Sequence, residues 1–272
     1  MLFPEPSMQP TDFSARVRQQ RGDLTDYVFH LTRGCTDPPV SPLQVLMEIL
    51  NSGLIRPTFA PYYSPSSGGK ARPGVKGPYP VVCLTEQPIS AVIRTLKFNP
   101  GRYSGYGVAY FKPTLYGEGG RPVLYGSDLE IGKKIKEGEP GWQEGKEIYT
   151  GGLPPELQYL WVKYDPLGAH AFNYKVDFTW EREWRVKFPS PRFKEGGLPV
   201  AIRNPWSSQQ GAIIVSKEAE VPEVRSCIEG YRERGLKWTR YVGKIISLEK
   251  ATERLELNDL RYARLETWPE DE

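Results

Sequence analysis

Tyr27–Arg33 has the sequence YVFHLTR, and a little further on Leu43–Gly53 has the sequence LQVLMEILNSG. The first stretch is a short apolar and β-branched run, which predicts a strand. In the second stretch and the residue that follows it, apolar residues recur at positions 43, 46, 47, 50 and 54, the spacing of one helix face. Ser41–Pro42 is a start signal for this helix, and Gly53 is a stop signal. The sequence therefore predicts a strand and then a helix, separated by the breaker TDPPVSP.

The rest of the chain mixes predicted strands and helices without strict alternation. Strands are predicted at 81–86, 105–112, 121–126, in two pieces within 173–188, and at 198–202, 211–216 and 244–249. Helices are predicted at 87–98, 128–137, 153–165 and 222–234, and 251–260 is predicted as a helix or an irregular tail. This order favours a single α+β domain over 25–268, preceded by a polar lead at 1–24. Gly and Pro account for 53 of 272 residues, which predicts a loop-rich fold.

Composition excludes several classes of protein. The net charge of +3 permits nucleic-acid binding but does not argue for it. Cys35, Cys83 and Cys227 are far apart and form no metal-binding spacing, which fits a reducing cytosol. No run approaches about 18 apolar residues, so we expect a cytoplasmic protein without a membrane partner. The motifs GxxxxGK[ST], GxGxxG, HExxH and GxSxG are absent.

His30 is the first residue that could carry chemistry. It lies in the middle of the predicted strand at Tyr27–Arg33, and Thr32 follows on the same face. An imidazole and a hydroxyl on one face can hold a polar ligand such as a ribose. The alternative is a partly buried histidine whose ring is satisfied by a backbone carbonyl.

A second candidate is the segment WEREWR at 180–185. In a continuous strand, Glu181 and Glu183 would share one face, while Arg182 and Trp184 would point to the other. Two neighbouring carboxylates can hold a hydroxyl or stabilise a cation. The alternative is an edge strand that carries surface ion pairs.

Two further segments have both a binding and a purely structural interpretation. In the aromatic strand at 103–111, Tyr106 or Tyr110 could stack on a flat ligand ring, or both could belong to the core. In the Gly/Pro/Ser-rich loop predicted at Tyr62–Pro80, the cations Lys70, Arg72 and Lys76 could contact phosphates or simply be solvated.

These motifs, in this order, resemble two groups of proteins. YVFHLTRG followed by LQVLMEILNSGLI resembles the opening of ADP-ribosyltransferase-like proteins, including DNA-modifying toxins of the DarT type. VVCLTEQPISAVI, YSGYGVAYFK, GGRPVLYG and EREWRV, taken together, resemble the AbiGi-type abortive-infection proteins of bacteria. The resemblance covers about 27–186.

The resemblance to ADP-ribosyltransferases implies a split, mixed and mostly antiparallel sheet that holds NAD, as substrate, in a cleft. Matched motif by motif, His30 and Thr32 would contact the cofactor and Tyr106 or Tyr110 would stack on its nicotinamide. Arg33, next to the first motif, could meet the pyrophosphate with both ends of its guanidinium.

The same resemblance implies that Glu183 is catalytic and that Glu181 assists it. A carboxylate near the ribose would stabilise the oxocarbenium-like cation that forms when the nicotinamide–ribose bond breaks. The second carboxylate could deprotonate an acceptor. The implied function is an NAD-dependent effector of phage defence or of a toxin–antitoxin pair, which transfers ADP-ribose to nucleic acid or protein. A cognate antitoxin or toxin would be a further partner.

Two other functions stay open at the level of sequence. One is a non-catalytic antitoxin or defence module that binds a partner protein or nucleic acid, a role also attributed to AbiGi-type proteins. The other is a nuclease or other hydrolase. That activity would require a metal cluster built from the glutamate pair and scattered acids, namely Asp128, Glu130, Asp165 and Asp177.

Overall fold

A mixed sheet organises the computed structural model of the chain, which describes residues 24–36, 39–61, 76–98, 103–126, 132–134, 136–139, 142, 144, 149–151, 154–164, 177–193, 196–203, 210–263, 265 and 268. The strands of this sheet follow the order β16-β15-β7-β1-β6-β13-β8, and β5 pairs with β6 outside this path. Their bounds are β1 Tyr27–Leu31, β5 Thr58–Pro61, β6 Lys76–Thr85, β7 Gly107–Phe111, β8 Arg121–Pro122, β13 Glu183–Lys187, β15 Gly211–Val215 and β16 Val242–Ser247.

Most neighbouring strands in this sheet are antiparallel. The exception is the pair β15 and β16, which run parallel, as strands joined by a crossover helix do. Helix α5 (Val221–Glu233) lies between them in the chain and provides that crossover. The structure thus confirms the predicted α+β class and a mixed, mostly antiparallel sheet.

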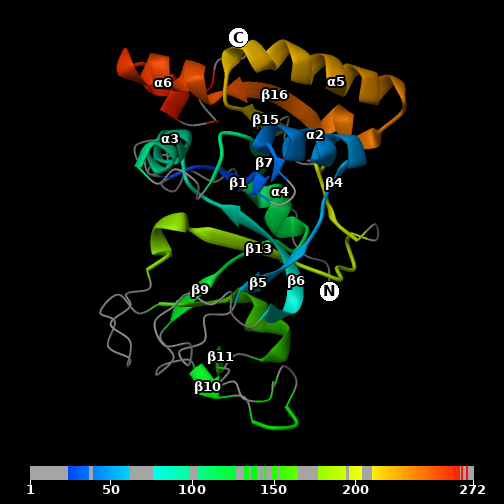
Figure 1. Cartoon of the computed structure of the whole chain (residues 1–272), viewed down its shortest axis with the longest axis vertical. Helices are drawn as coiled ribbons and strands as arrows, with labels where there is room; N and C mark the ends of the chain where they lie inside the picture. Colours follow the sequence, from blue (N-terminus) through cyan, green and yellow to red (C-terminus); the bar gives the residue numbers. More distant parts are fainter. Residues whose placement is uncertain are drawn as a thin grey trace, which may run out of the picture.

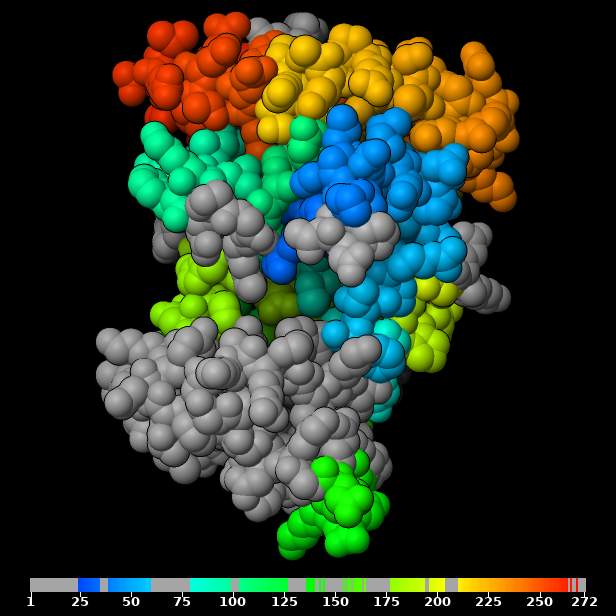
Figure 2. Space-filling view, viewed as in Figure 1, coloured from blue at the N-terminus to red at the C-terminus, as the bar shows by residue number. Residues whose placement is uncertain are grey.

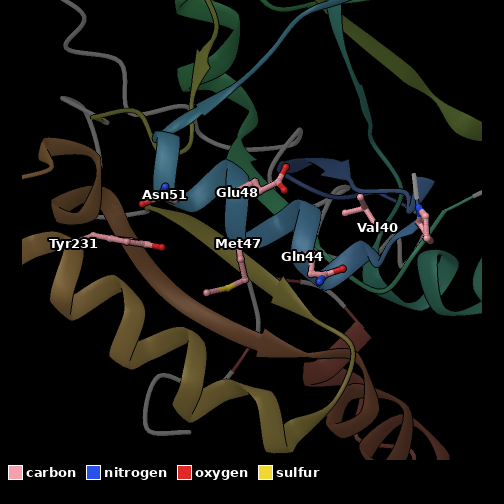
Figure 3. A pocket seen from close by; sticks show the side chains of 7 residues that line it. Val40, Gln44, Met47, Glu48, Asn51 and Tyr231 are labelled. Carbon is pink, nitrogen blue, oxygen red and sulfur yellow. The ribbon is translucent and has the colours of Figure 1, made fainter. Parts of the chain in front are cut away.

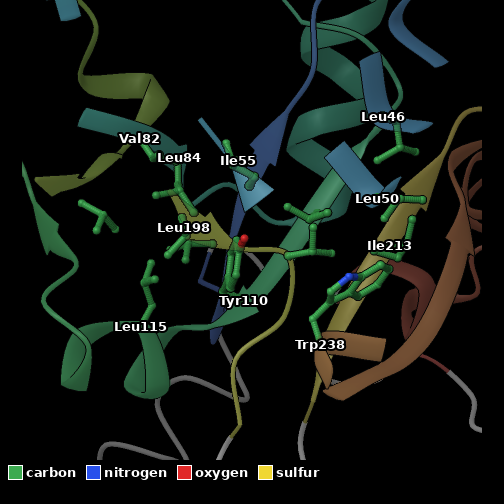
Figure 4. Packing of buried hydrophobic residues seen from close by; sticks show 14 of the residues in the cluster. Leu46, Leu50, Ile55, Val82, Leu84, Tyr110, Leu115, Leu198, Ile213 and Trp238 are labelled. Carbon is green, nitrogen blue, oxygen red and sulfur yellow. The ribbon is translucent and has the colours of Figure 1, made fainter. Parts of the chain in front are cut away.

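Helices cover the sheet on both faces (Figure 1). On one face, α2 (Pro42–Ser52) and α5 pack against Val28 of β1 through a cluster that includes Leu46, Leu50 and Val224. Figure 4 shows part of this cluster, with Leu198 beside Tyr110 and with Leu50 close to Ile213. On the other face, α3 (Ile89–Phe98), α6 (Leu248–Glu256) and the short helix η6 (Leu260–Ala263) cover Phe29. Alternation along β1 therefore sends Val28 and His30 to the α2 face and Phe29 to the α3 face.

The helix predicted after the first strand is confirmed as α2, and its end signals act as expected. The Ser41 hydroxyl accepts a hydrogen bond from the Gln44 backbone N–H at 3.2 Å, and the Gln44 side chain accepts one from the Ser41 N–H at 2.8 Å. Gly53 ends the helix with φ of 71°, and a Cβ there would lie 2.8 Å from the Trp238 ring. Backbone conformation and close packing both require glycine at this position.

Several predicted elements differ from the structure. Within the helix predicted at 128–137, Gly132–Lys134 forms β10, which pairs with β11 (Tyr149–Gly151). The helix predicted at 153–165 is instead a 3₁₀ helix, η2 (Pro155–Leu160), followed by β12 (Trp161–Lys163). Strand β12 pairs in parallel with β9 (Leu124–Gly126), so its aromatic and β-branched residues form sheet contacts rather than another helical turn.

Other predictions fall partly or wholly outside the described residues. The polar lead at 1–24 is described only at its last residue, and Lys70 and Arg72 of the predicted loop lie outside. Lys76 does not belong to that loop, because β6 begins there and pairs with β5. Asp128, Glu130 and Asp165 also lie outside. Within the described part of the chain, no helix has both the length and the apolar character needed to cross a membrane.

Candidate functional site

Strands β1 and β6 stop pairing next to His30, and we call the place where they separate the opening at His30. Strand β1 forms five register pairs with β7 but a single one with β6, between Phe29 and Thr85. If this antiparallel ladder continued, Leu31 would lie opposite Cys83. The Cys83 carbonyl oxygen lies 2.9 Å from Nδ1 of the His30 imidazole instead. Where the two strands separate, the His30 side chain thus takes the place of a backbone N–H as the hydrogen-bond partner of Cys83 O.

The hydrogen bond fixes the protonation pattern of His30. A carbonyl oxygen only accepts hydrogen bonds, so Nδ1 must carry the proton. Burial lowers the pKa of His30 below its ordinary value of 6.5, although the bond to Cys83 opposes this effect. The neutral ring then leaves Nε2 as an acceptor, which suits a ligand hydroxyl. The contact also matches the structural alternative stated above, a ring satisfied by a carbonyl.

Thr32 lies just beyond the end of β1, in a group of internal polar contacts. Its hydroxyl is within hydrogen-bond distance of Pro42 O (3.1 Å), Tyr106 O (3.1 Å) and Ser104 Oγ (3.0 Å). The side chain is 2% exposed, so these contacts fix the entry to β7. The neighbouring Arg33 is exposed, and its guanidinium lies 5.3 Å from the centre of the Tyr103 ring.

The two predicted stacking tyrosines occupy different environments. Tyr106 donates to Glu220 Oε1 at 2.8 Å, and burial together with this bond raises the pKa of Tyr106 to about 12. Tyr110 is 2% exposed and donates to Pro199 O at 2.8 Å within the α2-side core. The ring of Tyr110 is therefore part of the core, which was the alternative interpretation of the aromatic strand.

Glu181 and Glu183 do not share a strand face, so that prediction is wrong. Glu181 ends the 3₁₀ turn η3 (Thr179–Glu181), and Arg182 follows with φ of 45°, in the left-handed region. Strand β13 begins only at Glu183. The left-handed residue breaks the alternation on which the prediction rested. Glu181 is 5% exposed, and its carbonyl oxygen accepts a hydrogen bond from the Thr85 hydroxyl.

The carboxylate of Glu183 is held by Arg185 from the same strand. Nε of Arg185 lies 2.8 Å from Oε1 of Glu183, and the second terminal nitrogen lies 3.2 Å from Oε2. The other terminal nitrogen of Arg185 donates to Tyr159 O at 2.7 Å and to Trp161 O at 3.3 Å. The guanidinium therefore joins the carboxylate to the backbone of η2 and β12. The ion pair is largely buried, unlike the surface ion pairs considered from the sequence.

Two residues beside Glu183 were not singled out from the sequence. Burial, the nearby Glu183 charge and a hydrogen bond to the Glu183 carboxylate raise the pKa of the Cys83 thiol. The Tyr125 hydroxyl of β9 accepts a hydrogen bond from the Glu183 N–H at 3.0 Å, and burial raises the pKa of Tyr125 to about 12. Both lie in segments that the sequence predicts as strands, and their approach to Glu183 depends on how those strands are arranged. We call Cys83, Tyr125, Glu181, Glu183 and Arg185 the Glu183 cluster.

The structure brings the predicted residues together in two groups separated by β6. His30, Thr32, Arg33 and Tyr106 lie at one end of β1, whereas Glu181 and Glu183 lie at the start of β13. Thr85 of β6 pairs with both Phe29 and Glu183, so the two groups lie at the same level of the sheet. Paired residues share a face, so Glu183 starts from the α3 face and His30 from the α2 face. The two side chains therefore start from opposite faces of the sheet, with β6 between their strands.

The surface of the described residues is concave near the middle of the molecule and between α2 and α5. Figure 2 shows a hollow near the middle of the molecule, with blue atoms of the β1 segment above it and yellow-green atoms of the η3–β13 segment beside it. A separate open groove of about 420 Å³ lies between α2 and α5. Figure 3 shows its lining residues, which include Val40, Gln44, Met47, Glu48, Asn51 and Tyr231. None of the predicted site residues lines this groove.

Comparisons with known proteins assign no family. No protein-family model, no curated protein and no solved structure matches the chain. Among the residues that the structure describes, no group of three or more His, Cys, Asp or Glu side chains could hold a metal ion. The candidate site consists of the opening at His30 together with the Glu183 cluster.

Proposed function

We propose that the chain is an NAD-dependent ADP-ribosyltransferase-like effector of bacterial phage defence or of a toxin–antitoxin pair. Its acceptor would be nucleic acid or protein. The observation that carries the proposal is the Glu183 carboxylate, which is held in place at the same level of the sheet as the opening beside His30. The order of the sequence motifs and the α+β fold are compatible with the proposal.

In the proposed reaction, the bond between nicotinamide nitrogen and ribose C1 breaks, and the electron pair leaves with nicotinamide. The ribose then carries positive charge, which Glu183 stabilises. An acceptor oxygen or nitrogen attacks C1 and loses its proton to Glu181 or to water. A carboxylate has about four lone-pair sites, so Glu183 can bind Arg185 through both oxygens and still accept from a ribose hydroxyl.

The other predicted residues have binding roles in this scheme. Nε2 of His30 would accept a hydrogen bond from a ribose hydroxyl, and the exposed Arg33 would contact the pyrophosphate. Thr32 would act mainly through the backbone, because its hydroxyl contacts Pro42, Ser104 and Tyr106. Tyr106 would be the stacking ring rather than the buried Tyr110.

The test is label transfer from NAD labelled in its adenine half to DNA, RNA and proteins of a bacterial lysate. We expect wild-type protein to label one acceptor class. Glu183→Gln should reduce transfer about 100- to 1000-fold, the loss typical when one group that stabilises developing charge is removed. Asp259→Asn removes a surface carboxylate that is also paired with an arginine two residues later, and it should transfer normally. Equal transfer by Glu183→Gln and wild type would overturn the proposal.

A second candidate function is a non-catalytic module that binds a partner protein or nucleic acid. It is favoured by the internal hydrogen bonds of Tyr106 and Tyr110 and by the open groove between α2 and α5. Purification of the tagged chain from its host would then recover a stoichiometric partner, and Met47→Glu in the groove would release it. Binding that Met47→Glu leaves unchanged would remove the groove from this account.

A further inference from the structure

Arg185 has contacts that suit a part in the proposed reaction without touching the substrate. It is 6% exposed, and its guanidinium contacts the Glu183 carboxylate on one side and two backbone carbonyls on the other. A guanidinium is planar and its donors are fixed in one fork, so anchoring one edge fixes the direction of the other. Tyr159 O and Trp161 O anchor that edge. The orientation of the carboxylate is therefore set by the backbone of η2 and β12.

We propose that Arg185 is a positioning residue that holds the Glu183 carboxylate toward the reacting ribose. The inference rests on the proposed function. Removing the residues that orient metal ligands typically costs about 10- to 100-fold in activity, and we expect a loss of the same order for a residue that orients a reacting carboxylate. Arg185 would act on the rate of bond breaking rather than on NAD affinity, because its guanidinium binds the Glu183 carboxylate and the Tyr159 carbonyl.

A second pair in the same chain provides a matched control. Asp259 and Arg261 have the same spacing, and Nε of Arg261 lies 2.9 Å from Oδ1 of Asp259. The second terminal nitrogen of Arg261 lies 2.7 Å from Oδ2. This pair lies beyond α6, at the start of η6, and Arg261 is 65% exposed. Arg261→Met therefore removes an equivalent guanidinium without touching Glu183.

The experiment measures nicotinamide release from NAD by wild type, Arg185→Lys, Arg185→Met, Arg261→Met and Glu183→Gln, each checked for folding by circular dichroism. We expect Arg185→Met to lower kcat about 10- to 100-fold, with KM for NAD within about twofold of wild type. Arg185→Lys keeps the charge but loses the fork, so it should recover part of kcat. It also keeps the test decisive if Arg185→Met fails to fold. Arg261→Met should match wild type.

The possible outcomes separate this inference from the proposed function. If wild type and Glu183→Gln both fail to release nicotinamide, the proposed function is overturned and the positioning role with it. If wild type is active and folded Arg185→Lys and Arg185→Met keep its kcat, only the positioning role is overturned. A rise in KM at unchanged kcat would also contradict it, because that result would place Arg185 in NAD binding.

Discussion

Two carboxylate–arginine pairs in this chain have the same local chemistry and different surroundings. Glu183–Arg185 and Asp259–Arg261 each place an arginine two residues after an acid, with Nε on one carboxylate oxygen and a terminal nitrogen on the other. The side chains of the first pair are 12% and 8% exposed, whereas Arg261 is 65% exposed. The first guanidinium also binds the backbone of η2 and β12, so burial and additional contacts distinguish a candidate site from a surface pair.

The largest difference should be seen in stability. Arg185→Met leaves a largely buried carboxylate without its partner, and we expect the free energy of unfolding to fall by about 3 kcal/mol. Arg261→Met removes an exposed pair, and its denaturation midpoint should stay close to wild type. Urea denaturation of both variants measures the contrast. Similar losses in the two variants would mean that burial does not separate the pairs.

The dependence of stability on pH should also differ between a buried group, His30, and an exposed pair, Asp259–Arg261. Burial lowers the pKa of His30, whereas hydrogen bonds from Arg261 lower the pKa of Asp259. In both cases the unfolded chain binds more protons than the folded chain. The free energy of unfolding therefore decreases as the pH is lowered, but over a different pH range for each group. The His30 range begins near its ordinary pKa of 6.5, and the Asp259 range begins near 3.8.

His30→Gln should therefore flatten the stability curve just below pH 6.5, where one group can contribute a slope of at most about 1.4 kcal/mol per pH unit. Asp259→Asn should flatten the curve only at the acidic end, near and below pH 3.8. Urea titrations across this pH range measure both slopes. A His30→Gln curve parallel to wild type just below pH 6.5 would contradict the lowered pKa of the His30 imidazole.

Salt should produce the smallest effect. Charges on the surface are screened at distances of about 3 Å in 1 M salt, whereas buried pairs are screened much less. In double-mutant cycles, the coupling between Asp259 and Arg261 should decline from low to high NaCl, and that between Glu183 and Arg185 should persist. An equal decline in both couplings would show that water reaches the Glu183 cluster.

Much of the fold followed from local patterns. The strands at β1, β7, β15 and β16 and the helices α2, α3 and α5 lie close to their predicted places, because apolar spacing and end signals are local properties. Between about 128 and 165 the predictions failed, because β10 and β12 are stabilised by pairing with β11 and β9. The identity of a strand's partner is not a local property, so it leaves no pattern in the sequence of the strand itself.

The candidate site was predictable as a set of residues but not as a geometry. His30 and Glu183 could be named from the sequence, yet their position across β6 from each other depends on strand order. Glu181 was misplaced because nothing in WEREWR announces the left-handed conformation of Arg182. Cys83 and Tyr125 were not singled out for a similar reason, since three different strands bring them to Glu183.

The central claim is that the Glu183 carboxylate promotes cleavage of the nicotinamide–ribose bond. The most direct measurement is nicotinamide release from NAD by purified wild type, Glu183→Gln and Asp259→Asn under identical conditions, with and without lysate as a source of acceptor. The account predicts release by wild type and Asp259→Asn and a loss of about 100-fold or more in Glu183→Gln. Release that is absent from wild type, or equal in all three proteins, would contradict it.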